Sequence, residues 1–206
     1  MSIIGRLASS SGRNDEELNI RLAEELVKGK NFKGIAELVE NLFNHDQSIA
    51  SDSIKVLYEV AYRAPELVED YWESFLRLLT SKNNRMVWGG AIALATIAAL
   101  RHRELYKHLD TIKKAYQNGS VITVDSCISI FAELAKADKK KEAELLPLLL
   151  QHLETCRPKE VAQHAERIAV CVNAANAEVF KVVLQKRYVS LTAPQKKRVD
   201  TLLRRL

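Results

Sequence analysis

Hydrophobic positions repeat along this chain with a period of 37 residues. From Ala50 to Ala61 the apolar side chains are spaced by four, three, three and one residues, which follows one face of an α-helix. Moving this set along the chain by 37 residues, three times over, reaches apolar positions every time. Each set predicts the second helix, helix B, of a repeat unit. The sets are Ala50, Ile54, Leu57, Val60 and Ala61; Val87, Ala91, Leu94, Ile97 and Ala98; Val124, Ile128, Phe131, Leu134 and Ala135; and Val161, Ala165, Ile168, Cys171 and Val172.

A second apolar stripe precedes each helix B at the same period and predicts a first helix, helix A. Turn-forming residues such as Asn118 and Gly119 lie between the two stripes. A single helix pair cannot bury all of its apolar surface, so neighbouring pairs are expected to stack. The helix A positions are Ile35, Leu38 and Leu42; Val68, Trp72, Phe75 and Leu79; Leu105, Leu109, Ile112 and Tyr116; and Leu146, Leu149 and Leu153.

This helix pair resembles the repeat unit of the HEAT/armadillo superfamily. The segment VWGGAIAL, from Val87 to Leu94, is the most similar to the HEAT pattern, although Trp88 stands where that pattern usually has Arg. The resemblance implies an all-α fold, a right-handed α-α superhelix (solenoid) of about four to five two-helix repeats. We predict an N-terminal segment and capping helix in residues 1–30, the repeat array in 31–190 and a basic capping helix in 191–206.

Composition agrees with a helical protein and indicates the kind of compartment in which it occurs. Hydrophobic residues make up 47% of the chain, enough to bury a core, and no run alternates as a half-buried strand does. Cys127, Cys156 and Cys171 lack a disulfide or metal-ligand spacing, which favours a reducing compartment. The most apolar stretch, residues 89–100, is too short to cross a bilayer. We therefore predict a soluble, cytoplasmic protein that does not associate with membranes.

Positive charge is concentrated in the last third of the chain. Residues 139–206 carry a net charge of +7, whereas residues 1–138 carry −2. We interpret Lys139–Lys141 as a solvated loop between helices. The remaining cations form a candidate basic patch, which either binds phosphates or an acidic protein surface, or is a solvated cap with cations at helix C-termini. The patch consists of Lys181, Lys186, Arg187, Lys196, Lys197, Arg198, Arg204 and Arg205.

Outward-facing positions of the B helices, which usually line the concave face of such a solenoid, are candidates for partner binding. The mixture of charged and aromatic residues there suits a protein or peptide better than a polyanion. An ordinary hydrated face is the alternative. The candidate partner-binding residues are Lys55, Tyr58, Glu59, Tyr62, Arg85, Trp88, Ser129 and Glu133.

Gly89 and Gly90 follow Trp88 inside a predicted helix, where each glycine costs about 1 kcal/mol relative to alanine. One explanation is a spot where a partner approaches the backbone, with Trp88 as an anchor. The other is close packing of neighbouring helices, with Trp88 filling a gap between repeats.

Neither a catalytic nor a metal site is predicted. The sequence contains no phosphate-binding loop, dinucleotide fingerprint or nucleophile elbow. His152 and Cys156, four residues apart, could present two ligands on one helix face, but a zinc site needs three or four. We predict no cofactor.

The resemblance implies a function in binding, because proteins of this superfamily are mostly scaffolds and partner-binding modules. We therefore predict a non-catalytic scaffold or adaptor that binds a protein partner on its concave helix B face. The alternative is a nucleic-acid-binding helical-repeat protein, of the type that excises alkylated bases, which uses the basic C-terminal end. That type needs a catalytic Asp beside aromatic side chains, for which Trp72, Trp88 and Asp125 are the candidates.

Overall fold

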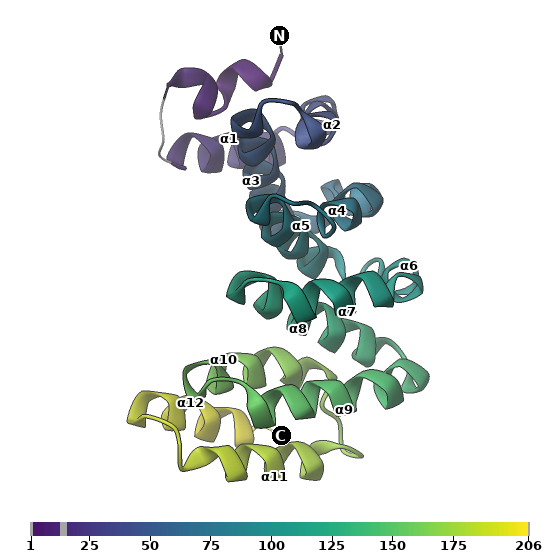
Figure 1. The fold of residues 1–206 in the computed structure, drawn as a ribbon, viewed down its shortest axis with the longest axis vertical. Coiled ribbons are helices and arrows are strands. Elements are labelled where there is room, and N and C mark those ends of the chain that lie inside the picture. The colour runs from purple at the N-terminus through teal and green to yellow at the C-terminus, as the bar shows by residue number, and fades with distance from the viewer. Residues whose placement is uncertain (1, 13–15, 206) are drawn as a thin grey trace. The chain divides into compact units, whose positions relative to one another are not determined.

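The computed structural model describes residues 2–12 and 16–205, and these residues form helices and connections without a strand (Figure 1). The predicted all-α class is therefore confirmed. The chain divides into two compact units, residues 1–127 and residues 128–206, and the division falls inside helix α8 (Val121–Ala137).

The first unit contains α1 to α7 and the beginning of α8. The α-helices are α1 (Glu17–Lys28), α2 (Phe32–Glu40), α3 (Gln47–Arg63), α4 (Trp72–Leu78), α5 (Asn84–Ile97), α6 (His102–Lys107) and α7 (Leu109–Asn118). Short 3-10 helices are η1 (Ile4–Arg6), η2 (Ser9–Ser11), η3 (Asn41–Phe43), η4 (Pro65–Leu67) and η5 (Glu69–Tyr71).

The second unit contains the rest of α8 and the last four α-helices of the described chain. These are α9 (Lys139–Thr155), α10 (Pro158–Ile168), α11 (Ala177–Tyr188) and α12 (Ala193–Leu203), with η6 (Ala169–Cys171) directly after α10. Among the described residues, no helix combines the length and the apolar character that crossing a membrane requires.

The predicted B helices exist, and their stripes form the core. They are α3, α5, α8 and α10, the last of which is extended by η6. Every position of the four predicted stripes is buried except Val87, Val124 and Val172, which are half-buried. The 3.6-residue period of the helix places these side chains on one face, so removing that face from water stabilises each unit.

The A helices are less regular than the period suggests. In the second repeat Pro65 opens η4, and α4 begins only at Trp72 after two 3-10 turns. In the third repeat His108 separates α6 from α7. The interpretation of Lys139–Lys141 as a loop is wrong, because these residues form the first turn of α9. Asp138 caps that turn by accepting a hydrogen bond from the backbone N–H of Lys141 (3.0 Å).

Gly89 and Gly90 allow helices to approach α5 closely. A Cβ atom at position 89 would lie 2.7 Å from Cγ1 of Ile54 in α3. At position 90 it would lie 2.8 Å from the backbone oxygen of Phe75 in α4. The packing explanation for the two glycines is therefore confirmed.

Additional helices cover the repeats at both ends of the chain. In the first unit α1 packs against α3, and buried Asn19 donates a hydrogen bond to Asp52 of α3 (2.8 Å). In the second unit α12 packs against α10 and buries Val199. Thr192 and Gln195 form a capping box at the start of α12.

Candidate functional site

Three aromatic side chains from α3 and α5 lie in a row. The ring centroid of Tyr58 is 6.0 Å from that of Tyr62 in an edge-on arrangement, and 6.0 Å from that of Trp88. Tyr62 is 58% exposed and Trp88 is half-buried. The sequence predicted that Tyr58 lies near the outward face. Its side chain is only 5% exposed, and its ring packs against the rings of the other two residues.

A network of ion pairs lies next to these rings. The Nζ atom of Lys55 is 2.8 Å from a carboxylate oxygen of Glu16 and 2.9 Å from one of Glu59. Arg63 contacts the other oxygen of Glu59 at 2.6 Å, and Arg85 contacts Glu16 at 3.3 Å. The network connects α3 and α5 to Glu16, the residue before α1.

The prediction that Lys55 faces outward is wrong, since its side chain is only 7% exposed. Helix α1 packs on α3, and Glu16 at its start reaches over the ammonium group. The sequence predicted α1 as a capping helix, but it did not show which face of α3 that helix covers.

The network keeps its members charged. Burial lowers the pKa of Lys55, but hydrogen bonds with Glu16, Tyr58 and Glu59 outweigh burial, so the pKa is raised overall. The hydrogen bond from Lys55 lowers the pKa of Glu16. Burial raises the pKa of Glu59, but Arg63 and Lys55 outweigh that effect and lower it. Burial raises the pKa of Tyr58. All four shifts lead away from neutral pH, which suits recognition better than proton transfer.

Arg85 completes the exposed part of this site. Its guanidinium carbon lies 5.4 Å from the ring centroid of Trp88, which is within the range of a cation–π contact. We call the surface formed by Tyr62, Arg85 and Trp88, with Glu59 and Arg63 beside them, the α3–α5 surface. It offers two aromatic rings, the two guanidinium groups of Arg63 and Arg85, and the carboxylate of Glu59.

The last two predicted partner-binding residues, Ser129 and Glu133, belong to the second unit. Arg167 of α10 donates a hydrogen bond to the hydroxyl of Ser129 (2.6 Å). Glu133 lies 4.0 Å from Lys136, one turn further along α8. Both side chains therefore take part in contacts within their own unit.

Much of the predicted basic patch serves the structure of the second unit. Arg198 forms two hydrogen bonds with Glu166, and Lys186 lies 3.5 Å from Glu154. Arg187 donates to the backbone oxygen of Cys156 (2.6 Å), and Arg204 donates to that of Asp200 (3.1 Å). Lys196 lies over the ring of Tyr188 (5.1 Å). Lys181 is half-buried in α11, whereas Lys197 and Arg205 are exposed near the end of the chain.

Trp72 and Trp88, two of the residues considered for base excision, each pack against another aromatic ring. Trp72 packs against His108, with ring centroids 5.4 Å apart, and Trp88 packs against Tyr58. Asp125 lies half-buried in the first turns of α8.

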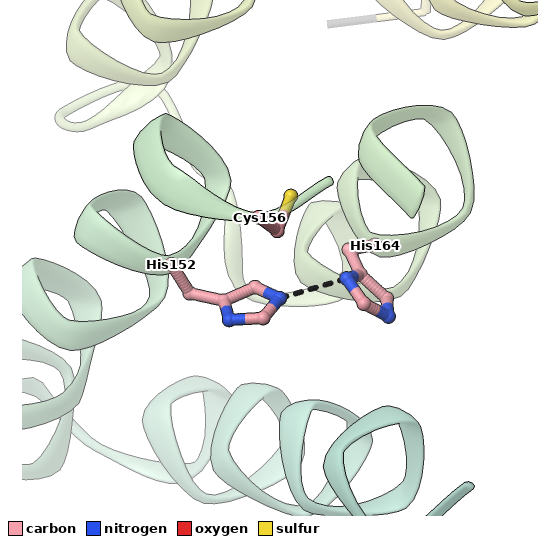
Figure 2. Close-up of side chains that lie close together, drawn as sticks. All are labelled: His152, Cys156 and His164. Atoms are coloured by element: carbon pink, nitrogen blue, oxygen red, sulfur yellow. Dashed lines mark hydrogen bonds between the residues drawn. The ribbon is translucent and has the colours of Figure 1, made fainter. Parts of the chain in front are cut away.

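One possible metal-binding group occurs among the described residues, and sequence analysis found only two of its three members. His152 of α9 and Cys156, the residue directly after α9, are joined by His164 of α10 (Figure 2). The Nε2 atom of His152 is 2.7 Å from Nδ1 of His164, and the ligand atoms of the three residues lie within 4.8 Å of one another. The ligand count that argued against a metal was therefore too low.

Comparisons with known proteins identify the fold. No protein-family model matches the chain, and no curated protein matches it. Among solved structures, an engineered protein is 18% identical, with a TM-score of 0.65, and the match covers 100% of this chain and 97% of that one. A designed armadillo repeat protein is 14% identical, also with a TM-score of 0.65, and the match covers 89% of this chain and 85% of that one.

A second designed armadillo repeat protein matches with the same identity, coverage and TM-score, and its structure is a complex with the peptide (KR)4. At these identities the similarity shows the fold. This chain has an all-α helical-repeat fold similar to that of armadillo repeat proteins, as the resemblance of its 37-residue repeat to the HEAT/armadillo unit implied.

Proposed function

We propose that this protein is a non-catalytic scaffold or adaptor that binds a protein partner, and that the α3–α5 surface is the binding site. The observation that carries the proposal is a pair of aromatic rings, exposed Tyr62 and half-buried Trp88, which pack against buried Tyr58 and lie beside Arg85.

The residue types on this surface are those that dominate protein interfaces. Tyr, Trp and Arg are enriched among the residues whose removal costs most binding energy. Tyr62 and Trp88 project from helices that pack directly on each other, so little side-chain and backbone freedom remains to be lost on binding.

The charges beside the rings also favour a protein partner. Glu59 and Arg63 form an ion pair on α3 at the border of the surface, and Arg85 carries a second positive charge. A surface with both signs of charge pairs with a mixed peptide sequence better than with a polyanion. The peptide-bound armadillo design shows the same fold in a complex with a peptide, which supports a peptide-binding use of this architecture.

Peptide selection tests this proposal directly. The immobilised full chain is used to select peptides from a random peptide library, and the selected peptides are measured by fluorescence anisotropy. Tyr62→Ala and Trp88→Ala should each weaken binding by at least tenfold, because interface anchors contribute about 2 kcal/mol or more. Both rings lie at the edge of the helix packing, so their removal should leave the fold intact. Circular dichroism of both variants should therefore show unchanged helix content.

Val189→Ala is the matched control, since Val189 is 86% exposed but lies in the second unit. Its effect on binding should be less than about twofold. Equal affinities for the wild type, Tyr62→Ala and Trp88→Ala would show that the α3–α5 surface is not the binding site.

A further inference from the structure

We propose that His152, Cys156 and His164 bind a zinc ion at the junction of α9 and α10. Imidazole nitrogen and thiolate sulfur are the ligands that zinc prefers in proteins. Three protein ligands with a water molecule in the fourth position form a well-known tetrahedral arrangement. This site lies in the second unit and shares no residue with the α3–α5 surface, so it stands independently of the proposed function.

The secondary structure positions all three ligands. His152 lies in the last turn of α9, and Cys156 follows the helix directly. The backbone N–H of Cys156 donates to the backbone oxygen of His152 (2.8 Å), so the two residues lie on the same side of the helix end. The chain turns at Arg157, and α10 begins at Pro158 with a capping box that fixes its start. His164, in the second turn of α10, then faces His152, as Figure 2 shows.

The distances are close to those that zinc requires. Zinc–nitrogen bonds of about 2.0–2.1 Å and zinc–sulfur bonds of about 2.3 Å place tetrahedral ligand atoms roughly 3.3–3.6 Å apart. The two ring nitrogens are now 2.7 Å apart, and Sγ of Cys156 lies within 4.8 Å of the histidine ligand atoms. Separating the rings by about 0.6 Å and turning the thiol toward them would complete the geometry, which side-chain rotation can achieve.

The surroundings limit the access of water to the ligands. His164 is fully buried, His152 is 7% exposed and Cys156 is half-buried. Ligands held in a buried environment lose little freedom when a metal binds. The exposed side of Cys156 gives the cation a path to the site.

Protons move in a defined way when zinc binds. Burial raises the pKa of the Cys156 thiol to about 11, so the thiol is protonated at neutral pH without metal. Zinc replaces that proton, which is released to solvent, and a zinc–sulfur bond forms. One of the two nitrogens that share the hydrogen bond carries a proton, and on zinc binding that ring becomes its other tautomer, with the proton on the nitrogen that faces away from zinc. Each imidazole then stays neutral with one proton, and the hydrogen bond between the histidines is exchanged for two zinc–nitrogen bonds.

Charged groups from the neighbouring helices modulate this exchange. Arg187 of α11 favours the thiolate of Cys156, whereas Glu160 of α10 opposes it. The carboxylate of Glu160 is itself hydrogen-bonded to Arg157 (2.9 Å).

Cobalt substitution is the test. The reduced, metal-free full chain is titrated with Co²⁺, which gives intense d–d bands in a tetrahedral site and a charge-transfer band from a thiolate ligand. We expect one Co²⁺ per chain with both signals, and stoichiometric displacement by Zn²⁺. Cys156→Ser should abolish the charge-transfer band and weaken zinc binding by about 100-fold or more, beyond the 10–100-fold effect of outer-sphere changes.

Cys171→Ser is the matched control, because Cys171 is a buried cysteine of the same unit that does not belong to the cluster. It should keep both signals. His152→Gln should lose the tetrahedral d–d bands. If His152 and His164 only form a hydrogen bond with each other and bind no metal, the wild type should give neither signal at about 100 μM Co²⁺ and pH 7.5. This result would overturn the proposal whether or not the variants fold. A thiolate band that survives in Cys156→Ser would also overturn it.

Discussion

At the scale of single residues, Lys55 shows how a charge can be buried without being neutralised. Its ammonium group is enclosed by Glu16 and Glu59, and Glu59 is held in turn by Arg63. The pairing outweighs the cost of removing Lys55 from water, so the network stays ionised. The ion-pair network also stabilises the part of α3 that carries Tyr58 and Tyr62, because Lys55 and Glu59 lie on either side of Tyr58 in that helix.

This network predicts a loss of stability in acid. The folded state lowers the pKa of Glu59 below its ordinary value of 4.5, and that of Glu16 likewise. A carboxyl group with a lowered pKa stabilises the fold above its ordinary value, and this contribution is lost as the pH falls through the folded pKa. In urea denaturation, Glu59→Gln should lower the free energy of unfolding by about 1.5–3 kcal/mol near pH 7, the size of hydrogen bonds to charged groups. The difference from wild type should shrink toward pH 3.

Glu17→Gln is the control for this experiment. Glu17 pairs with Arg21 on the exposed side of α1, where such pairs contribute less than about 1 kcal/mol. A Glu59→Gln deficit that stayed constant from pH 7 to pH 3 would show that the lost stability is not electrostatic.

At the scale of helices, α5 connects its two neighbours in the first unit by packing closely against both. It packs against both α3 and α4, and the two glycines after Trp88 let each neighbour approach its backbone. The intrinsic cost of glycine in a helix, about 1 kcal/mol each, is offset by the dispersion contacts that close approach allows. The same approach places Trp88 against Tyr58.

Gly90→Ala should therefore destabilise the protein even though alanine is the better helix former. The new methyl group would lie 2.8 Å from the backbone oxygen of Phe75, and backbone cannot rotate away as a side chain can. We expect the free energy of unfolding to fall by about 1–3 kcal/mol, as for other overpacked sites. Urea denaturation followed by circular dichroism measures this change.

Gly5→Ala is the matched substitution, since a Cβ atom there has no neighbour within 4 Å. It should change stability by less than about 0.5 kcal/mol. A Gly90→Ala variant as stable as wild type would mean that α4 can move away from α5 at little cost.

At the scale of the whole molecule, charge is divided unequally along the chain. Residues 139–206 carry +7 and residues 1–138 carry −2. Sequence alone allowed this excess to serve as a nucleic-acid surface. In the second unit, however, Arg198 and Lys186 pair with Glu166 and Glu154, and Arg187 binds backbone oxygens. These cations stabilise contacts between helices.

We therefore expect only weak binding to nucleic acids. Fluorescent single-stranded and duplex DNA should bind with a Kd weaker than about 100 μM at ~150 mM salt, the weak limit of non-specific association. Micromolar binding that weakens steeply with salt, and is lost when Lys196 and Lys197 are changed to Glu, would support the nucleic-acid alternative over the scaffold.

The positions of the B helices and of their apolar faces could be predicted from the sequence alone. Helix periodicity is local, so residues such as Ile54 and Leu57 mark the buried face without reference to the rest of the chain. The 37-residue period then predicted the repeat fold, because helix pairs of this kind can bury their surface only by stacking. For Gly89 the sequence left two explanations open, and the nearby Ile54 of α3 supports the packing one.

The contacts between polar residues, and the burial of some of them, follow from the packing of the helices and could not be predicted from the sequence. The position of Lys55 on α3 predicted an exposed side chain. The side chain is instead buried beside α1, a helix that lies more than 25 residues earlier in the sequence. His152 and Cys156 looked like an incomplete pair, and α10 supplies His164 after a turn at Arg157. Periodicity describes one helix at a time, whereas burial and ligand sets depend on contacts between helices. The sequence predicted Tyr62, Arg85 and Trp88 as partner-binding residues, but their grouping around buried Tyr58, like the three-ligand cluster, could be found only in the folded chain.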